Sequence, residues 1–357
     1  MVGSEYELVC QWRDRMLDAD GQGAFIGPSF EYPRQVAKVD RAMRELAISK
    51  WSPNADLGRP ATCHRSLIHA VKLIRSCANV QYEDIKLFYS KHKLSPYFEL
   101  LADEAKSFRA QAVWGCGTDR HSINEWVKRV RGLVKDAGFT RMLFAHERSA
   151  RKNALSLKRY ISRLHDLWSR LCVVRVDLAY RRAYREVTKE IEPMRVKHDL
   201  AAFLRLLKET FPALIGYVWK MEYGQNKSYH IHFMAIFNGN DVCRDVLLGK
   251  ALGELWCEIV TKGDGGYWNC NAKKKYYERR GGVGIGMVAY DDFQKREHLI
   301  RAALYLTKVD YYVRLNVEGI GRVFGKGQIS NSVSSKQGRR RKNQNLIGSV
   351  LSSAAGV

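Results

Sequence analysis

What the sequence lacks narrows the class of protein before any motif is considered. No apolar run reaches about 18 residues, the length that a membrane-spanning helix needs, and Met1–Glu5 has no signal-peptide character and no lipidation motif beside a basic amphipathic terminus. The eight cysteines include no Cys-x-x-Cys pair, so neither a zinc knuckle nor a disulfide framework is expected. These absences predict a cytoplasmic protein with reduced thiols and no membrane partner.

Acidic residues are also scarce relative to basic ones. The chain of 357 residues has 60 Lys plus Arg against 37 Asp plus Glu, a formal net charge of +23. A charge of this sign and size favours a polyanionic partner, and DNA or RNA is the economical choice. From about Lys326 onward the sequence has no acidic residue and little apolar content, so residues 327–357 are predicted to form a flexible basic tail.

The run His230-Ile-His232 is the most specific chemical feature of the chain. It lies in the segment Ser228–Phe237, which is rich in β-branched and aromatic residues and is followed by an Asn-Gly turn signal. Alternate side chains of a strand share a face, so both imidazoles are expected to project to the same side. Such a pair is either half of a metal site or two polar positions on a half-exposed strand.

A carboxylate that could complete the site is Glu222, eight residues before His230. It belongs to a predicted strand, Ile215–Tyr223, that forms a hairpin with the histidine strand. A loop with an odd number of residues, such as Gln225 to Lys227, places Glu222 opposite His230, whereas an even loop places it on the other face. Two imidazoles and one carboxylate with open positions suit Mg²⁺ or Mn²⁺ bound together with a phosphate, although Zn²⁺ would also bind.

A predicted helix over Asp291–Val313 carries Tyr305 and Lys308, which stand three residues apart and therefore share a face. A tyrosine is a competent nucleophile toward phosphorus once its phenol loses a proton and the phosphate charge is screened. Lys308 and a divalent ion would do the screening. The helix is also an ordinary amphipathic one, on which Tyr305 could simply be packed.

The chain resembles the HUH endonuclease superfamily in the order of three elements: the strand with Glu222, the His-x-His strand and the Tyr-x-x-Lys helix. The likeness is greatest to inovirus-type (filamentous-phage) replication initiators of phages and prophages, and it covers about residues 167 to 326. Microvirus initiators carry a second tyrosine four residues after the first, where this chain has Val309. The likeness rests on five segments: Val173–Tyr180, Trp219–Glu222, Tyr229–His232, Tyr305–Lys308 and Arg322–Gly325.

The resemblance implies a metal-dependent endonuclease and strand transferase, with Tyr305 and Lys308 catalytic and a Mg²⁺ or Mn²⁺ ion held by Glu222, His230 and His232. It would nick single-stranded or hairpin DNA at an origin through a 5′-phosphotyrosine intermediate, leaving a 3′-hydroxyl that primes rolling-circle replication. The cytoplasm of a bacterial host and a host helicase and polymerase as partners are also implied, and the oligomeric state stays open. Two alternatives are a single-tyrosine HUH transposase and an inactive basic DNA-binding regulator.

Asp177, in the first predicted strand, is an alternative third ligand or a partner for Lys308. Tyrosine and basic residues interleave in a loop near residue 276, where they could hold phosphates and stack bases; this could be an ordinary solvated loop instead. The predicted nucleic-acid-binding residues of this loop and of the tail are Lys273, Lys274, Lys275, Tyr276, Arg279, Arg280, Arg339, Arg340 and Arg341.

The expected order of elements after residue 165 is βαββαβ followed by the tyrosine helix, which predicts an α+β fold. The implied arrangement over residues 166–326 is the ferredoxin-like one, a four-stranded antiparallel sheet with helices on one face and the tyrosine helix against the other. Residues 1–165 are predicted to form a separate helical domain whose basic faces could grip duplex DNA. The predicted elements are strands Cys172–Tyr180, Ile215–Tyr223, Tyr229–Phe237 and Gly284–Tyr290 and helices Val196–Thr210 and Val242–Val260.

Overall fold

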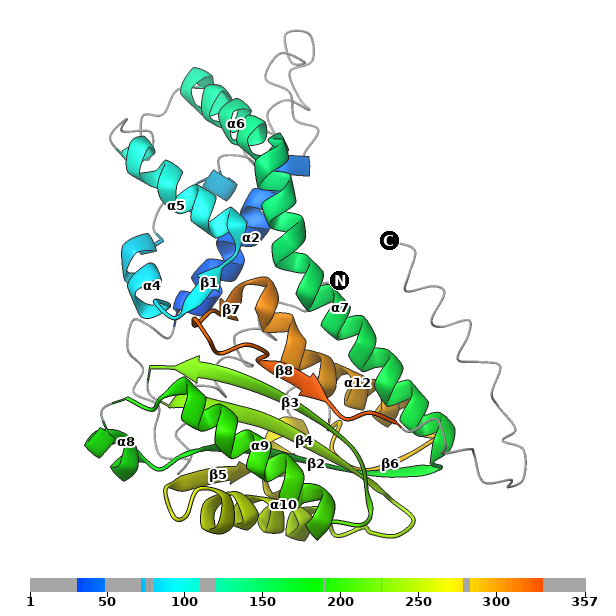
Figure 1. Cartoon of the computed structure of the whole chain (residues 1–357). Coiled ribbons are helices and arrows are strands. Elements are labelled where there is room, and N and C mark those ends of the chain that lie inside the picture. Colours follow the sequence, from blue (N-terminus) through cyan, green and yellow to red (C-terminus); the bar gives the residue numbers. More distant parts are fainter. Residues whose placement is uncertain are drawn as a thin grey trace.

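The protein combines helices with an antiparallel sheet, an α+β architecture, in a computed structural model (Figure 1). The structure describes residues 31–48, 72–74, 77, 80–109, 120–188, 190–225, 227–278 and 283–329. Most of the predicted basic tail therefore lies outside the described residues. Within the described part, every helix is too short or too polar to cross a membrane.

The sheet has six strands, not the four that were predicted. Its order is β5-β2-β4-β3-β8, with β6 also paired to β2, and all neighbouring strands are antiparallel. The added strands are short: β5 lies in a glycine-rich segment that resembles a loop, and β8 has three residues. The strands are β2 (Arg170–Tyr180), β3 (Leu214–Gly224), β4 (Ser228–Asn238), β5 (Gly265–Asn269), β6 (Gly286–Ala289) and β8 (Phe324–Lys326).

Strand β2 has room for two partners on one edge because it is 11 residues long. β6 pairs with its first part, up to Val173, and β5 pairs with its second part, from Val176. In the gap, the buried side chain of Asn271 takes the place of a strand. Its Oδ1 accepts from the Arg175 amide at 2.8 Å and its Nδ2 donates to the Val173 carbonyl at 2.9 Å, so the backbone groups of β2 stay paired where neither strand reaches them.

One face of the sheet is covered by α9 (Pro193–Thr210) and α10 (Asp245–Glu254), which continues into a π-helical segment over Leu255–Val260. The side chains between them form an apolar core in which Phe203 of α9 contacts Phe233 of β4 and Trp256, with ring centroids 5.1 and 5.8 Å apart. Alternation along β2, β3 and β4 supplies the apolar residues of this face.

The other face is apolar at one end and polar at the other. Its apolar end packs against α12 (Phe293–Lys308) and also against α7 (Ala137–Leu167), which covers a face expected to carry the tyrosine helix alone. Toward the other end the same face of the strands carries buried polar groups in place of aliphatic ones. The buried ones are Arg175, Lys220, Glu222, His230 and His232, and Asp177 beside them is partly buried.

The helix α7 connects the sheet to a helical part with its own apolar core. It has 31 residues, a length of about 46 Å, and it begins where Asp136 accepts hydrogen bonds from the amides of Gly138 and Phe139. A second connection is the pairing of β1 (His92–Leu94) with β7 (Val313–Leu315). The remaining elements are α2 (Tyr32–Ile48), α4 (Tyr82–Phe88), α5 (Pro96–Arg109), α6 (Arg120–Lys135), α8 (Arg182–Thr188), η3 (Cys270–Lys273), α11 (Lys274–Glu278) and η4 (Val309–Tyr311).

Asn271→Ala is expected to lower the free energy of unfolding by about 2 kcal/mol, because two buried backbone groups of β2 lose their partners. Denaturant unfolding followed by circular dichroism measures the change. Asn240→Ala, at an exposed position in the turn after β4, serves as the control and should change the stability by less than about 0.5 kcal/mol. Equal effects of the two substitutions would contradict the bridging role of Asn271.

Candidate metal centre

The hairpin register places the predicted ligands on one face of the sheet. β3 ends at Gly224 and β4 begins at Ser228, so three residues separate them, and Glu222 lies directly opposite His230. Cross-strand partners point to the same side. The carboxylate of Glu222 therefore faces the same space as the imidazoles of His230 and His232.

The three side chains converge to distances close to those of a metal site. Glu222 Oε2 lies 3.4 Å from His232 Nε2 and 3.9 Å from His230 Nε2, and one ligand atom from each residue lies within 4.8 Å of the others. Donors bound at about 2.1 Å to one ion stand about 3 to 3.4 Å apart, so a small closure would complete the site. All three residues are at least 94% buried, with 6, 3 and 1% of their surface exposed for Glu222, His230 and His232.

Hydrogen bonds to the other ring nitrogen fix how each imidazole is presented. His232 Nδ1 lies 2.7 Å from Asp177 Oδ1, and His230 Nδ1 lies 3.1 Å from the Ser228 carbonyl oxygen. Both acceptors require a proton on Nδ1, which leaves Nε2 as the metal-binding atom. Neither Nε2 atom has a hydrogen-bond partner among the residues that the structure describes. Asp177 therefore lies behind the His232 ring, outside the group of three, and its carboxylate fixes the orientation of that ring.

The two imidazoles have different electrostatic surroundings. Burial, and then the charges of His232 and Lys227, lower the pKa of His230 to about 3, which keeps its imidazole neutral and able to bind a metal. Burial lowers the pKa of His232, but Asp177 and Glu222 raise it by more, above its usual value. Burial would raise the pKa of Asp177, but His232 and Arg175 outweigh it and hold this pKa well below its usual range.

Helix α12 brings Tyr305 to the same end of the sheet. The tyrosine is buried, and its ring meets the His232 ring edge-on with centroids 6.4 Å apart. The Arg175 guanidinium lies 5.2 Å from the centroid of the Tyr305 ring, and Arg175 Nε lies 3.5 Å from Asp177 Oδ1. Lys308 is the last residue of α12, and its side chain lies outside what the structure describes.

Two buried cations near the ligands were not singled out from the sequence. Arg175 alternates with Asp177 on β2, and Lys220 alternates with Glu222 on β3, so both face the site. Lys220 Nζ donates to Asp310 Oδ1 at 2.5 Å, and both residues are buried. The i, i+2 spacing was the available signal, but a lysine or arginine on a strand usually indicates solvent exposure.

The predicted nucleic-acid-binding loop is only partly described. Lys273 lies over the Trp268 ring, with Nζ 5.7 Å from its centroid, and Trp268 pairs with Asp177 across the β2–β5 register, at the edge of the site. Lys274 instead forms an ion pair with Asp245 at 2.6 Å, and Lys275 is exposed. The side chain of Tyr276 and residues Arg279, Arg280, Arg339, Arg340 and Arg341 lie outside the described part.

In a comparison with protein families, residues 140–327 match the model described as the YagK/YfjJ C-terminal domain. The matched region begins within α7, ends just after β8, and contains Glu222, His230, His232 and Tyr305. No curated protein and no solved structure matches the chain.

Asp177→Asn is expected to weaken binding of Mn²⁺ by about 10- to 100-fold, because the orienting carboxylate behind His232 loses its charge. Isothermal titration calorimetry measures the affinity. Asp241→Asn, at an exposed turn, should leave it unchanged, and His230→Ala should abolish it. An Asp177→Asn protein with wild-type affinity would show that Asp177 does not support the ligand.

Proposed function

The chain belongs to the YagK/YfjJ C-terminal domain family, and we propose that it is a metal-dependent HUH-type endonuclease and strand transferase that nicks DNA. The observation that carries the proposal is the convergence of Glu222, His230 and His232 within 4.8 Å, with Tyr305 presented to the same space by another element. Two imidazole nitrogen donors and a carboxylate suit Mg²⁺ or Mn²⁺, and a tyrosine beside them suits phosphoryl transfer.

The order of strands supports this assignment. The elements β2, α9, β3, β4, α10 and β6 follow one another as βαββαβ, and in the sheet the four strands stand in the order β6-β2-β4-β3. This is the order of a ferredoxin-like sheet, the arrangement that the resemblance to HUH enzymes implies. In the proposal, β5 and β8 are additions at its two edges.

The chemistry assigned to the chain is a transesterification at one phosphodiester. The Tyr305 oxygen attacks the phosphorus, the bond from phosphorus to the 3′ oxygen breaks, and the phenolic proton is lost as that oxygen gains one. The products are a 5′-phosphotyrosine and a free 3′-hydroxyl, so the reverse attack rejoins the strand. The bound divalent ion would lower the negative charge of the phosphate. Arg175, over the Tyr305 ring, adds positive charge where the anion develops. The proposal keeps for Lys308 the catalytic role that the resemblance implies.

Burial of the site sets a condition on the substrate. Because Glu222, His230, His232 and Tyr305 are at most 6% exposed, a base-paired duplex cannot reach them. The polar end of the sheet must open to admit an unpaired strand, such as single-stranded DNA or the unpaired part of an origin hairpin. The proposed setting is initiation of rolling-circle replication of a phage or mobile element in a bacterial cytoplasm, with a host helicase and polymerase acting on the freed 3′ end. A single-tyrosine HUH transposase would use the same site.

The same burial favours a second candidate function. Closed sites with fully buried ligands are typical of structural metals, so the ion would stabilise the sheet of a basic DNA-binding regulator that does not cut. A metal-loaded protein that binds DNA but never forms a covalent adduct would establish this alternative.

Tyr305→Phe is expected to abolish the covalent protein–DNA adduct, with strand cleavage falling at least about a thousandfold, since the substitution removes only the nucleophilic oxygen. Labelled single-stranded DNA from the element that encodes the protein, incubated with Mn²⁺ and analysed on a denaturing gel, gives the readout. Tyr311→Phe is the matched control and should react normally. An adduct formed by Tyr305→Phe protein would place the nucleophile elsewhere, with Tyr311 and Tyr312 next in line.

Removal of the metal with a chelator is expected to stop cleavage, and addition of Mn²⁺ or Mg²⁺ should restore it. His230→Ala and His232→Ala should each lose metal-dependent cleavage, and Glu222→Ala should lose somewhat less, because water can occupy its position. The same cleavage assay, repeated across metal concentrations, tests this. Undiminished cleavage in the presence of chelator would contradict a metal-dependent reaction.

A further inference from the structure

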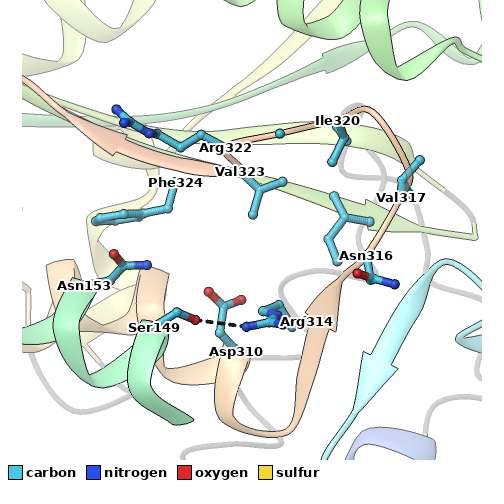
Figure 2. A pocket seen from close by; sticks show the side chains of 12 residues that line it. Ser149, Asn153, Asp310, Arg314, Asn316, Val317, Ile320, Arg322, Val323 and Phe324 are labelled. Carbon is cyan, nitrogen blue, oxygen red and sulfur yellow. Dashed lines mark hydrogen bonds between the residues drawn. The ribbon is translucent and has the colours of Figure 1, made fainter. Parts of the chain in front are cut away.

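A pocket of about 360 Å³ opens beside the candidate metal centre, between α7 and the segment from Asp310 to Phe324 (Figure 2). One wall is apolar and includes Val323 and Phe324. The opposite wall is polar and includes Asn153, Asp310 and Arg314. The volume is within the range of pockets that hold small organic ligands, about 300 to 1,000 Å³.

The polar wall is held in place by contacts within the protein. Asp310 accepts a hydrogen bond from Lys220 Nζ at 2.5 Å. Arg314 donates to Ser149 Oγ at 3.0 Å (Figure 2). The charge of Asp310 is thus already balanced by Lys220, whereas the Arg314 guanidinium contacts a neutral hydroxyl. It offers carboxylate oxygens that accept hydrogen bonds and amide and guanidinium groups that donate them.

An apolar wall facing a polar edge of donors and acceptors suits a planar heterocycle with hydrogen-bonding groups on its rim. An unpaired nucleobase has this form: its face can stack on an aromatic ring and its edge can pair with side chains. Arg322 lies on the rim of the pocket and is exposed, where it can meet the phosphate of the same nucleotide.

The pocket is next to the metal ligands in the sheet. Lys220 of β3 lies opposite His232 of β4 on one side and opposite Phe324 of β8 on the other. His232 and Phe324 are therefore two strand spacings apart, about 10 Å, with the Lys220 side chain between them. A base held on Phe324 would belong to a nucleotide close to the reacting phosphate.

We propose that this pocket binds one unpaired base of a single-stranded DNA substrate and so positions the strand at the metal centre. The inference rests on the proposed function, which supplies the strand. The proposed ligand is one nucleotide within a DNA strand. A free nucleotide is the alternative source, because it carries the same base and phosphate groups.

Photocrosslinking of the full chain carrying Tyr305→Phe tests the proposal without cleavage. A series of single-stranded DNAs of about 16 nucleotides is prepared, each with 5-iodouracil at a different position. Each DNA is irradiated with the protein, and crosslinked peptides are identified by mass spectrometry. One position in the series should crosslink to Phe324. No crosslink to the pocket from any position would overturn the proposal.

Two substitutions measure what the pocket contributes. Phe324→Leu should remove the crosslink and weaken strand binding about tenfold, as expected for loss of one base-aromatic stack. Val323→Trp, whose ring would fill the pocket, should have the same effect and serves if Phe324→Leu does not fold. Phe211→Leu, beside the core on the opposite face, is the matched control and should bind normally. Unchanged strand binding in folded Val323→Trp protein would also overturn the proposal.

Different outcomes identify the source of the base and test the proposed nuclease function. Strand binding that Val323→Trp leaves intact, together with loss of binding of a free nucleoside monophosphate, would assign the pocket to a free nucleotide and overturn the proposal. If the wild type forms the Tyr305 adduct but no position crosslinks to Phe324, only the pocket assignment fails. If the crosslink forms but the adduct does not, the base site stands and the nuclease fails.

Discussion

The pairing of Glu222 with His230 is the contact on which the rest of the site depends. Side chains alternate along a strand, so a slip of one residue in this hairpin would turn Glu222 to the other face. There its carboxylate would enter the apolar core around Phe203 and Trp256, at a cost of several kcal/mol for an unpaired charge. The apolar core on one face and the ligand group on the other therefore specify the same register.

The same face of the sheet serves two purposes along its length. Its apolar end packs under α7 and α12, and this packing fixes the position of Tyr305 on α12. Its polar end gathers two cations, Arg175 and Lys220, with carboxylates and imidazoles in a space from which water is nearly excluded. Burying so many polar groups opposes folding unless they are paired. Buried polar networks of this kind are typical of functional sites, where the protein is less stable than an apolar core would make it.

The sequence predicts the strongly periodic elements because their signals are local. The two strands of the hairpin are within one residue of their predicted bounds, and the tyrosine helix begins two residues later and ends five residues earlier than predicted. The sequence left the register of Glu222 open between an odd and an even loop, and the observed loop of three residues places Glu222 opposite His230. Strands β5 and β8 were missed because five glycine-rich residues and three residues carry too little pattern. The place of α7 over the sheet and the ion pair of Lys220 with Asp310, 90 residues apart, depend on tertiary packing, which local periodicity does not encode. Asp177 was an open choice between a third ligand and a partner of Lys308, and its observed contact is instead with His232 Nδ1, 55 residues away in the chain.

The most direct test of this account is the position of a bound ion. Crystals grown with Mn²⁺ and measured at the manganese absorption edge should show one anomalous peak within about 2.0 to 2.6 Å of the Nε2 atoms of His230 and His232 and of the Glu222 carboxylate. The peak should lie on the same side of the sheet as Tyr305. An anomalous peak elsewhere, with these three ligand atoms bound to no metal, would contradict the assignment of the metal centre.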